Sequence, residues 1–439
     1  MASNNQGKLK KVFGGTKSFF GALGKKDWFI SLSSSIFSIV LGLLIGLIVM
    51  LFVNPSMAFP GLGRLLTSGF RSGDTFANVL YNAAPIIMTG LSVAFAFKTG
   101  MFNIGGAGQF VCGGVAAIIS AVVWKMPCAV SILIAMVFGA LCGAIPGLLK
   151  AFFNVNEVLS AIMLNWISLI GAYLLCSNIP SVLDPGNSST TVHIIRLINP
   201  NGILPSRGLD NLGGGLTISI FIAIFFAVIV YILMQKSTFG FELRATGNNK
   251  FCSRYAGISD KKAIISTFLI SGALAGIGGA LFYLSPTTTQ GFELQYSTLP
   301  SEGFDGIAVA LLGASNPIGA IFSGMFVSYL DVSGASLQSL HYAPEVVDLV
   351  TGFILFFASF ASFFRIIIYR VYNEKGLIKG FICFKNSCVK WFHIIVNWIV
   401  KTFISFKTWL IKLFTSKSKS RAVEESQQNA VEKKEEDKK

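Results

Sequence analysis

The sequence predicts an all-α, polytopic membrane protein, and three observations point to that fold class. Of its 439 residues, 53% are hydrophobic and only 13% are charged, about half the charged share of a soluble domain. Eight apolar segments approach or exceed the roughly 20 residues that a helix needs to cross a bilayer. Lysine and arginine gather in alternate connecting segments, as expected of cytoplasmic loops. We therefore predict about ten transmembrane segments, with both termini in the cytoplasm.

The first expected span follows a basic segment, residues 1–27. The apolar run after it is longer than the core of a signal peptide and has no small-residue cleavage site, so we expect no cleavage there. A split helix pair, residues 304–314 and 317–331, is expected later, since Asn316-Pro317 interrupts an apolar stretch and proline cannot continue a helix. The eight full spans are expected at residues 28–53, 79–97, 103–124, 128–149, 157–177, 216–234, 263–283 and 345–364.

Charge assigns the two sides of the membrane. Residues 235–262 form a polar island with six Lys or Arg against two acidic residues, which is typical of a cytoplasmic loop. Residues 178–215 are expected to form a long outer loop, because they are polar and rich in turn residues. Two further outer segments, 284–303 and 331–348, hold acidic but no basic residues. This acidic composition has two explanations: the segments dock a partner, or they are outer loops that simply lack basic residues.

The net charge of +15 would suggest a nucleic acid partner in a soluble protein. Here the basic residues cluster in expected cytoplasmic segments, which favours membrane lipid over any nucleic acid polymer. Beyond the permease domain, residues 28–370, polar residues recur every three or four positions from Lys390 to Lys412. That spacing predicts an amphipathic helix on the cytoplasmic leaflet, within residues 371–415. Residues 416–439 are charged and of low complexity, and are expected to be disordered.

Sequence motifs for catalysis are missing. No G-x-x-x-x-G-K-[ST], H-E-x-x-H or G-x-S-x-G pattern occurs, so the chain is not expected to hydrolyse ATP or to act as an enzyme. Its three His and seven Cys are scattered, without the spacing of a metal site or a disulfide framework. No metal or cofactor is therefore expected in this chain.

Polar residues inside apolar segments are the candidates for contact with a polar solute. Asn103 and Gln109 flank residues 105–108, which contain three glycines. Such a run allows backbone to approach either a ligand or another helix, and in the second case the amides would be cross-links between helices. Asn165 lies deep in the fifth span and is a further candidate for the lining of a pathway.

Two patterns predict structure within the membrane. Asn154, with Glu157 three residues later, resembles a capping box, which predicts that Asn154 caps the fifth span. Gly272, Gly276 and Gly279 share the small-residue spacing of close helix contacts. We expect these glycines to lie where the seventh span packs on its neighbours.

The split pair supplies two more candidates. Broken helices at membrane depth are tolerated where they are buried or line a cavity, and their ends offer free backbone groups to a solute. Asp305 is expected either to cap the first half-helix or to meet the solute. Phe304 is expected either to stack on a planar ring or to pack within the protein.

Four stretches in register resemble the permease family of ABC importers that handle simple sugars, branched-chain amino acids and nucleosides. The resemblance is nearest to permeases paired with Bmp-type lipoproteins, whose characterised substrates are mainly purine nucleosides. It implies a type II importer fold in a bacterial cell membrane, a separate ATPase that uses ATP and Mg²⁺, a second related permease, and a lipoprotein that delivers solute outside. The matching stretches are residues 102–109, 156–165, 243–248 with 255–258, and 303–313.

The resemblance also implies roles for individual residues. Residues 249–252 depart from the family pattern before Tyr255-Ala-Gly-Ile258, so the coupling helix is expected to start differently. The implied pathway residues are Asn103, Gln109, Asn165, Phe304 and Asp305. The implied contacts to the ATPase are Glu242, Arg244, Gly247, Asn248, Arg254, Tyr255 and Gly257.

Other functions stay open on the residues alone. An importer for a simple sugar or for riboflavin would use similar side chains. A self-sufficient, ion-coupled transporter would need an acidic site within the membrane, and no acid is placed mid-span by the pattern. A membrane-embedded enzyme would need a cluster of acids or histidines, which the sequence lacks.

Overall fold

The computed structural model describes residues 27–184, 190–191, 195–209, 216–286, 292 and 298–373. Residues 26–366 form one compact unit. The second unit comprises residues 1–25 and 367–439, so the predicted amphipathic helix within 371–415 and the predicted disorder of 416–439 fall almost wholly outside the described residues. The described part is helical, and its one isolated bridge joins Leu183 to Thr191.

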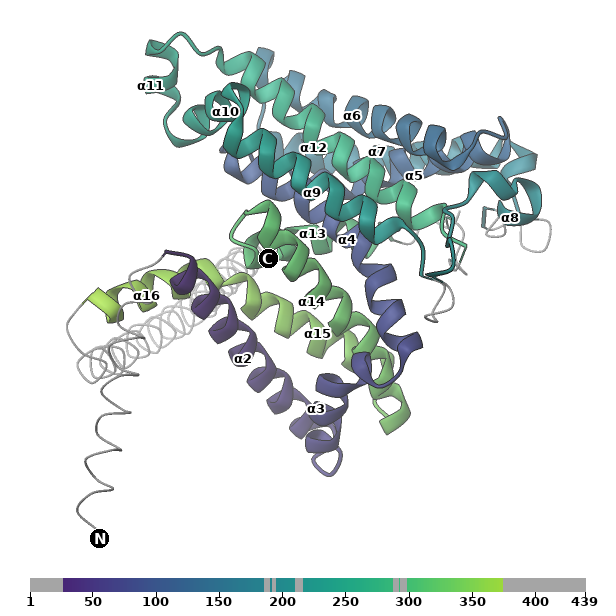
Figure 1. Ribbon diagram of the computed structural model, residues 1–439, viewed down its shortest axis with the longest axis vertical. Helices are drawn as coiled ribbons and strands as arrows, with labels where there is room; N and C mark the ends of the chain where they lie inside the picture. Colours follow the sequence, from purple (N-terminus) through teal and green to yellow (C-terminus); the bar gives the residue numbers. More distant parts are fainter. Residues whose placement is uncertain are drawn as a thin grey trace, which may run out of the picture. The chain divides into compact units, whose positions relative to one another are not determined.

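Figure 1 shows the order and arrangement of the helices. In chain order they are α2 (Asp27–Val53), α3 (Ala58–Thr67), α4 (Gly73–Lys98), α5 (Gly106–Val122), α6 (Cys128–Phe153), α7 (Glu157–Ser177), α8 (Ile195–Ile198), α9 (Ser219–Lys236), α10 (Thr238–Asn248), α11 (Lys250–Tyr255), α12 (Asp260–Tyr283), α13 (Ser301–Leu312), α14 (Pro317–Ala335), α15 (Pro344–Ser359) and α16 (Ala361–Asn373). Short 3₁₀ turns follow α3, α7, α8 and α14.

Seven of the described helices are long and apolar enough to cross a membrane: α2, α4, α6, α7, α9, α12, and α14 with the turn that extends it. Six of these seven helices coincide with expected full spans. α5, with 17 residues, and α15, with 16 residues, are shorter than the predicted spans at those places. α14 was expected as a short half of the split pair, yet it is itself of spanning length.

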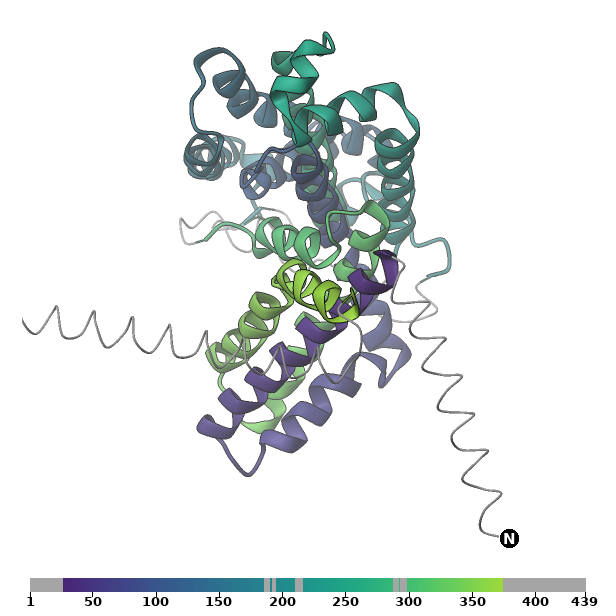
Figure 2. The ribbon, with the colours of Figure 1, turned by 90° about the vertical axis from the view of Figure 1, so that its left-hand side faces the viewer.

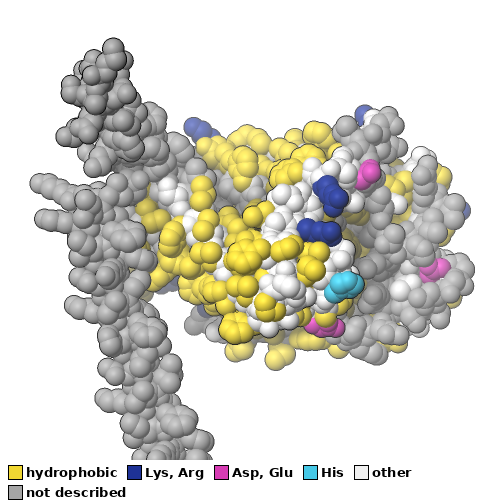
Figure 3. Space-filling model, turned by 90° about the horizontal axis from the view of Figure 1, so that it is seen from below, with side chains coloured by type: hydrophobic (Ala, Val, Ile, Leu, Met, Phe, Trp, Pro, Cys, Tyr) yellow, Lys and Arg dark blue, Asp and Glu magenta, His cyan; other side chains and the backbone are white. Residues whose placement is uncertain are grey.

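The apolar surface agrees with a multi-pass membrane protein. Large hydrophobic side chains lie exposed along α2, α6, α7 and α9, for example Met163 at 63%, Ile167 at 64% and Phe225 at 60%. Exposed apolar residues in such numbers are stable only against lipid or another protein. A broad band of apolar side chains, with few charges, is visible on the face shown in Figure 3.

α12 lies at the centre of the unit, packed against α4, α5 and α6. Its glycines permit this: a Cβ placed on Gly272 or Gly276 would overlap the backbone of α6, and one on Gly279 would overlap the backbone of α5. The predicted helix-packing role of these glycines is therefore confirmed. α4 also packs against α12, and 89% of its most apolar stretch is buried inside the protein.

A second group of helices packs around α14. α14 contacts α3, α4 and α15, while α15 lies along α2. In Figures 1 and 2 the green α15 lies beside the purple α2. Met50, Leu65, Tyr342 and Ile354 belong to the apolar cluster that joins these helices.

The break between α13 and α14 is where the sequence predicted it. Ala314 and Ser315 adopt positive φ angles of 53° and 52°, and the Ser315 N–H donates to the Ala310 carbonyl at 2.7 Å. The Asn316 side chain then caps α14 by accepting from the Ile318 N–H at 3.1 Å, with Pro317 at the first helical position. With 12 residues, α13 is about 18 Å long, too short to cross a bilayer.

The predicted cap at Asn154 is wrong, and the capping alternative for Asp305 is excluded. Asn156, and not Asn154, caps α7, because its Oδ1 accepts from the Val158 N–H at 2.9 Å. Asn154 instead ends α6 in the left-handed conformation, which Asn tolerates better than most residues. Glu157 pairs with Lys150 at 2.9 Å and so joins the ends of α6 and α7. Asp305 lies within α13, which starts at Ser301, so it does not cap that helix.

Candidate functional site

The start of α13 lies against the middle of α4 and the start of α5. The Thr89 hydroxyl, in the middle of α4, donates to the Glu302 carbonyl at 2.8 Å. Gly303 and Gly306 make the approach possible, since a Cβ on the first would overlap Ala107 and a Cβ on the second would overlap Thr89. The half-helix therefore begins about halfway along a buried, spanning helix.

The first turn of α13 has no side-chain cap from the residue before it, because that residue is Pro300. Local contacts are the Gly303 N–H donating to the Pro300 carbonyl at 3.2 Å and the Glu302 carboxyl accepting from its own backbone N–H. Phe304 is 38% exposed and Asp305 is half-buried. The carboxyl group of Asp305 is close enough to those of Glu302 and Asp331 for their negative charges to repel one another. These features resemble the half-helix ends that meet solutes in transporters.

Asn103 and Gln109 bind each other. The Asn103 Nδ2 donates to the Gln109 Oε1 at 2.9 Å, and the Gln109 Nε2 donates back to the Asn103 Oδ1 at 3.2 Å. Asn103 also donates to the Ser271 hydroxyl of α12 at 2.6 Å and accepts from the Gly105 N–H at 3.0 Å. Both amides are at most 1% exposed. In this structure they connect the turn before α5 to α12, as the cross-link alternative expected.

Asn165 connects the same turn to α7. Its Oδ1 accepts from the Gly108 N–H at 2.9 Å, and its Nδ2 donates to the Ile104 carbonyl at 3.1 Å. The side chain is 2% exposed. A Cβ on Gly108 would come within 2.8 Å of the Asn165 Cα, so the two helices meet at backbone distance. Asn103, Gln109 and Asn165 are therefore buried around the turn before α5, and the first residues of α5 adjoin α13 where Ala107 meets Gly303. Of the predicted pathway residues, only Phe304 and Asp305 are accessible.

The polar island holds two short helices, α10 and α11, between α9 and α12. The sequence departure at residues 249–252 has a local explanation: the Asn249 Oδ1 accepts from the Phe251 N–H at 2.9 Å and from the Cys252 N–H at 3.1 Å. Asn249 thus caps α11, which starts at Lys250, and Asn is among the strongest N-cap residues. Gly257 ends this region with a φ of 80°, a conformation that glycine adopts without strain.

Most of the seven predicted coupling residues are accessible. Glu242, Asn248, Arg254 and Gly257 are exposed, and Arg244 and Gly247 are half-buried. Tyr255 is 94% exposed. Two neighbouring aromatics that the sequence analysis did not single out, Phe241 at 63% and Phe251 at 76%, share this surface.

The coupling region and the amide pair are linked by backbone contact. A Cβ on Gly100 would lie 2.8 Å from the Gly247 Cα, and a Cβ on Gly247 would lie 2.8 Å from the Gly100 N. Gly100 adopts a φ of 74° and stands three residues before Asn103. Sequence reasoning missed Gly100, Thr89 and Ser271, because only the fold brings these small residues beside their partners.

Within the described ranges, no group of three or more His, Cys, Asp or Glu residues could hold a metal ion. The chemistry of the site is therefore that of backbone N–H groups, amides, hydroxyls and one exposed aromatic ring, together with half-buried carboxyl groups. Such a set can bind a polar solute reversibly.

Comparison with known proteins shows which family this chain is similar to. The family described as the permease component of branched-chain amino acid transport systems matches residues 75–359, which include all four resembling stretches. The nucleoside ABC transporter permease protein NupB of Lactococcus lactis subsp. cremoris is 35% identical over 73% of this chain and 88% of NupB. No solved structure matches the chain.

Two further relatives differ in the substrates for which they are named. The guanosine ABC transporter permease protein NupP of Bacillus subtilis is 34% identical over 77% of this chain and 96% of NupP. The glucose ABC transporter permease protein TsgB13 of Haloferax volcanii is 29% identical over 72% of this chain and 84% of TsgB13. The nucleoside-named relatives are thus the more similar of these three.

Proposed function

Because this chain belongs to the family of permease components of branched-chain amino acid transport systems, we propose that it is a permease subunit of an ATP-driven importer for purine nucleosides. The identity of 34–35% to permeases named for guanosine and nucleosides carries the proposal. The chain forms half of the passage, and a second, related permease forms the other half. A lipoprotein delivers the solute from outside, and a separate ATPase uses ATP and Mg²⁺.

In the proposed topology, both termini and α10–α11 lie in the cytoplasm of a bacterial cell. α5 and α15 serve as shorter spans beside the seven longer helices. The chain enters the membrane again before α13, whose half-length is acceptable because it lies against α4 and not against lipid. The six basic residues of 235–262 support a cytoplasmic position, and the polar segment 178–215 is placed outside.

The proposed passage runs along the accessible side of α13. The ring of Phe304 suits stacking on a nucleobase, and the first-turn N–H groups with Asp305 suit the hydroxyl groups of a ribose. Asn103, Gln109 and Asn165 stand behind this surface and hold α5 and α7 in place. They meet the solute only in a state where the reciprocal amide pair has opened.

The proposed ATPase contact is the exposed surface of α10 and α11. Tyr255 and Phe251 offer apolar area that is stable only when covered. Movement of α10 would reach the turn before α5 through the contact between Gly247 and Gly100. That turn carries Asn103 and adjoins α13, so closure of the ATPase would alter the passage through rigid, contacting backbone.

Uptake into vesicles tests the function. Membrane vesicles that contain the chain and its native partners would be supplied with the lipoprotein, radiolabelled guanosine, and ATP on the cytoplasmic side. We expect ATP-dependent uptake that unlabelled adenosine suppresses and glucose or riboflavin does not. Suppression by glucose or by riboflavin would favour that alternative substrate. Uptake that follows an ion gradient without ATP would favour the secondary transporter.

Phe304→Ala tests the passage in the same vesicles. Base stacking on an aromatic ring is worth enough that its loss raises the KM for guanosine about tenfold, while Phe304→Trp restores it. Phe225→Ala is the matched control, because that ring is 60% exposed on α9, away from α13. An unchanged KM in Phe304→Ala would remove Phe304 from the passage.

A further inference from the structure

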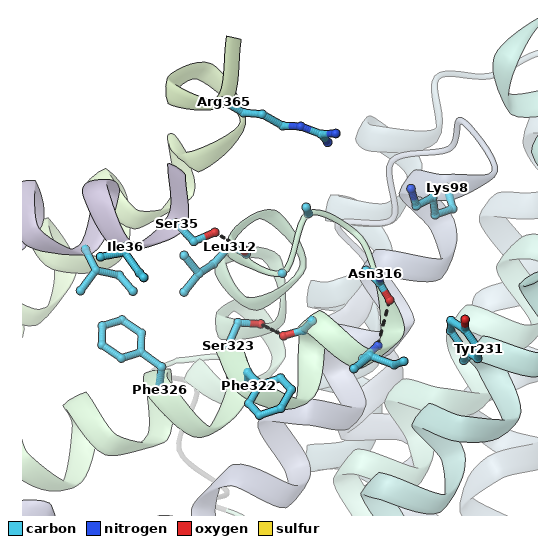
Figure 4. Close-up of a pocket in the computed structure, with 15 residues that line it drawn as sticks. Ser35, Ile36, Lys98, Tyr231, Leu312, Asn316, Phe322, Ser323, Phe326 and Arg365 are labelled. Atoms are coloured by element: carbon cyan, nitrogen blue, oxygen red, sulfur yellow. Dashed lines mark hydrogen bonds between the residues drawn. The ribbon is translucent and has the colours of Figure 1, made fainter. Parts of the chain in front are cut away.

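A cavity of about 710 Å³ lies at the turn between α13 and α14, with further walls from α2, α9 and α16. Figure 4 shows the turn at its centre, with Lys98 on one side and the side chain of Arg365 reaching over the turn from the other. None of the predicted pathway residues lines it. It is therefore distinct from the accessible surface at the start of α13.

The cavity brings two positive charges together. Lys98 and Arg365 line it, and none of the described residues that line it is acidic. Lys98 lies within electrostatic range of both Arg365 and Arg244. Of the ion pairs recorded for the described residues, none involves these three cations. Like charges that repel one another beside an apolar region are stabilised by a bound anion.

The remaining wall is mainly apolar and open. Phe322 is 70% exposed, Ile36 is 54% exposed and Ile318 is 43% exposed, and all three line the cavity. Apolar area of this kind next to paired cations matches the two ends of an amphipathic molecule. A free phosphate ion would satisfy the cations but would leave the apolar wall uncovered.

We propose that this cavity binds one anionic phospholipid, with its phosphate between Lys98 and Arg365 and an acyl chain along Ile36 and Phe322. Basic pockets between membrane helices on the cytoplasmic side are known to favour such headgroups. The placement in the cytoplasmic leaflet rests on the topology of the proposed function. The lipid would contact the turn that joins the half-helix α13 to α14, and so would favour one position of that turn.

The turn at the phosphate end is held in place by contacts within the protein. The Asn316 side chain caps α14 at the turn, and the Ser35 hydroxyl donates to the Leu312 carbonyl at 3.1 Å. Both residues line the cavity, so the turn is already held from α2 on one side and by its own cap on the other. A headgroup seated here meets a preformed surface.

Native mass spectrometry of the full chain with its bound subunits tests the site. The protein would be titrated with phosphatidylglycerol, phosphatidylcholine and inorganic phosphate. We expect one tight site for phosphatidylglycerol, and K98Q/R365Q should weaken it roughly thirtyfold, since each basic residue near the headgroup contributes to binding. K98R/R365K should retain it and shows that the fold tolerates substitution. K236Q/K262Q is the matched control, because it removes two exposed charges outside the cavity.

Three results would overturn the proposal. The first is equal binding of phosphatidylglycerol by wild type and K98Q/R365Q. The second is binding of inorganic phosphate with the same dependence on both cations and no advantage for the lipid, which would indicate a free-anion site. The third is binding of the lipid only after the ATPase subunit has been removed, which would assign the cations to carboxylates of that partner. Nucleoside uptake is measured in vesicles reconstituted from the same protein, so a failed importer and a missing lipid site give different results.

Discussion

Two regions of this protein carry family-like motifs, and they differ in how their residues are satisfied. Where the start of α5 meets α12, the glycines contact backbone and the amides bind one another, so these residues have almost no group left for a ligand. On α10 and α11 the aromatic side chains stand free, with Tyr255 at 94% exposure. The same sequence signal therefore marks a packed interior in one place and an uncovered surface in the other.

The comparison indicates that the motif residues serve two different purposes, which are stability of the fold in the interior and contact with a partner on α10 and α11. Interior residues act through contacts that the chain makes with itself, so their substitution should first lower stability. Residues on α10 and α11 have few such contacts, so their substitution should leave stability unchanged and alter only what needs a partner. The following substitutions test that division, from the largest expected effect to the smallest.

Gly276→Leu should have the largest effect on folding. A side chain there must enter the space of the α6 backbone, and overpacking of this kind costs roughly 3 kcal/mol or more. We expect a strong loss of folded protein, measured by thermal unfolding in detergent. Gly171→Leu on α7 is the control, because a Cβ there meets nothing within 4 Å. Equal stability of the two variants would mean that α6 and α12 are not packed at backbone distance.

Asn103→Leu should come next. It leaves the Gln109 amide and the Gly105 N–H without their partner, and a buried unsatisfied polar group costs about 1–3 kcal/mol. The double variant Asn103→Leu with Gln109→Leu should cost less than the sum of the single changes, because both halves of the pair are then absent. Strictly additive losses in chemical or thermal unfolding would show that the two amides do not interact.

Asn249→Ala should have a smaller, local effect. It removes the N-cap of α11, worth about 1 kcal/mol, and should speed hydrogen exchange of the α11 amides without lowering the melting temperature of the whole unit. Asn249→Asp keeps the acceptor oxygen and should behave as wild type. Faster exchange throughout α12 as well would contradict the view that α10 and α11 are stabilised independently of the interior.

Tyr255→Ala should change stability by less than about 0.5 kcal/mol, since the side chain is exposed. On the proposed function it should nevertheless reduce ATP-driven uptake and weaken copurification of the ATPase. Phe225→Ala is the control, because it removes an exposed aromatic ring from α9, outside the α10–α11 surface, and it should affect neither. Normal uptake by Tyr255→Ala would place the ATPase contact elsewhere.

Much of this fold could be predicted from the sequence, for reasons that particular residues make clear. Spans follow from apolar length, and the break before α14 follows from Asn316-Pro317, because proline excludes helix continuation wherever it occurs. The capping assignment failed because two asparagines, Asn154 and Asn156, stand near one helix start. Their spacing is compatible with either cap, and only the path of the chain at the end of α6 selects Asn156.

The arrangement of the candidate site could not be predicted from the sequence. Asn103, Gln109 and Asn165 were singled out as polar residues in apolar segments, and all three lie buried around the turn before α5, while their place in a pathway stays a prediction. Their mutual satisfaction could not be foreseen, since it depends on distances between helices that are far apart in the sequence. Ser271 and Thr89 gave no signal of their own, because a hydroxyl in an apolar segment usually bonds to its own helix.

Composition, charge and local chemistry by themselves determined that this chain is a helical membrane protein, where its helices break, and which family it resembles. Those properties depend on near neighbours in the chain and on the solvent around each segment. Only the tertiary structure decided which glycines meet backbone, that the pathway amides are paired, and that Lys98 and Arg365 face one cavity. Those outcomes depend on contacts between distant segments, which a single sequence does not encode in any local pattern.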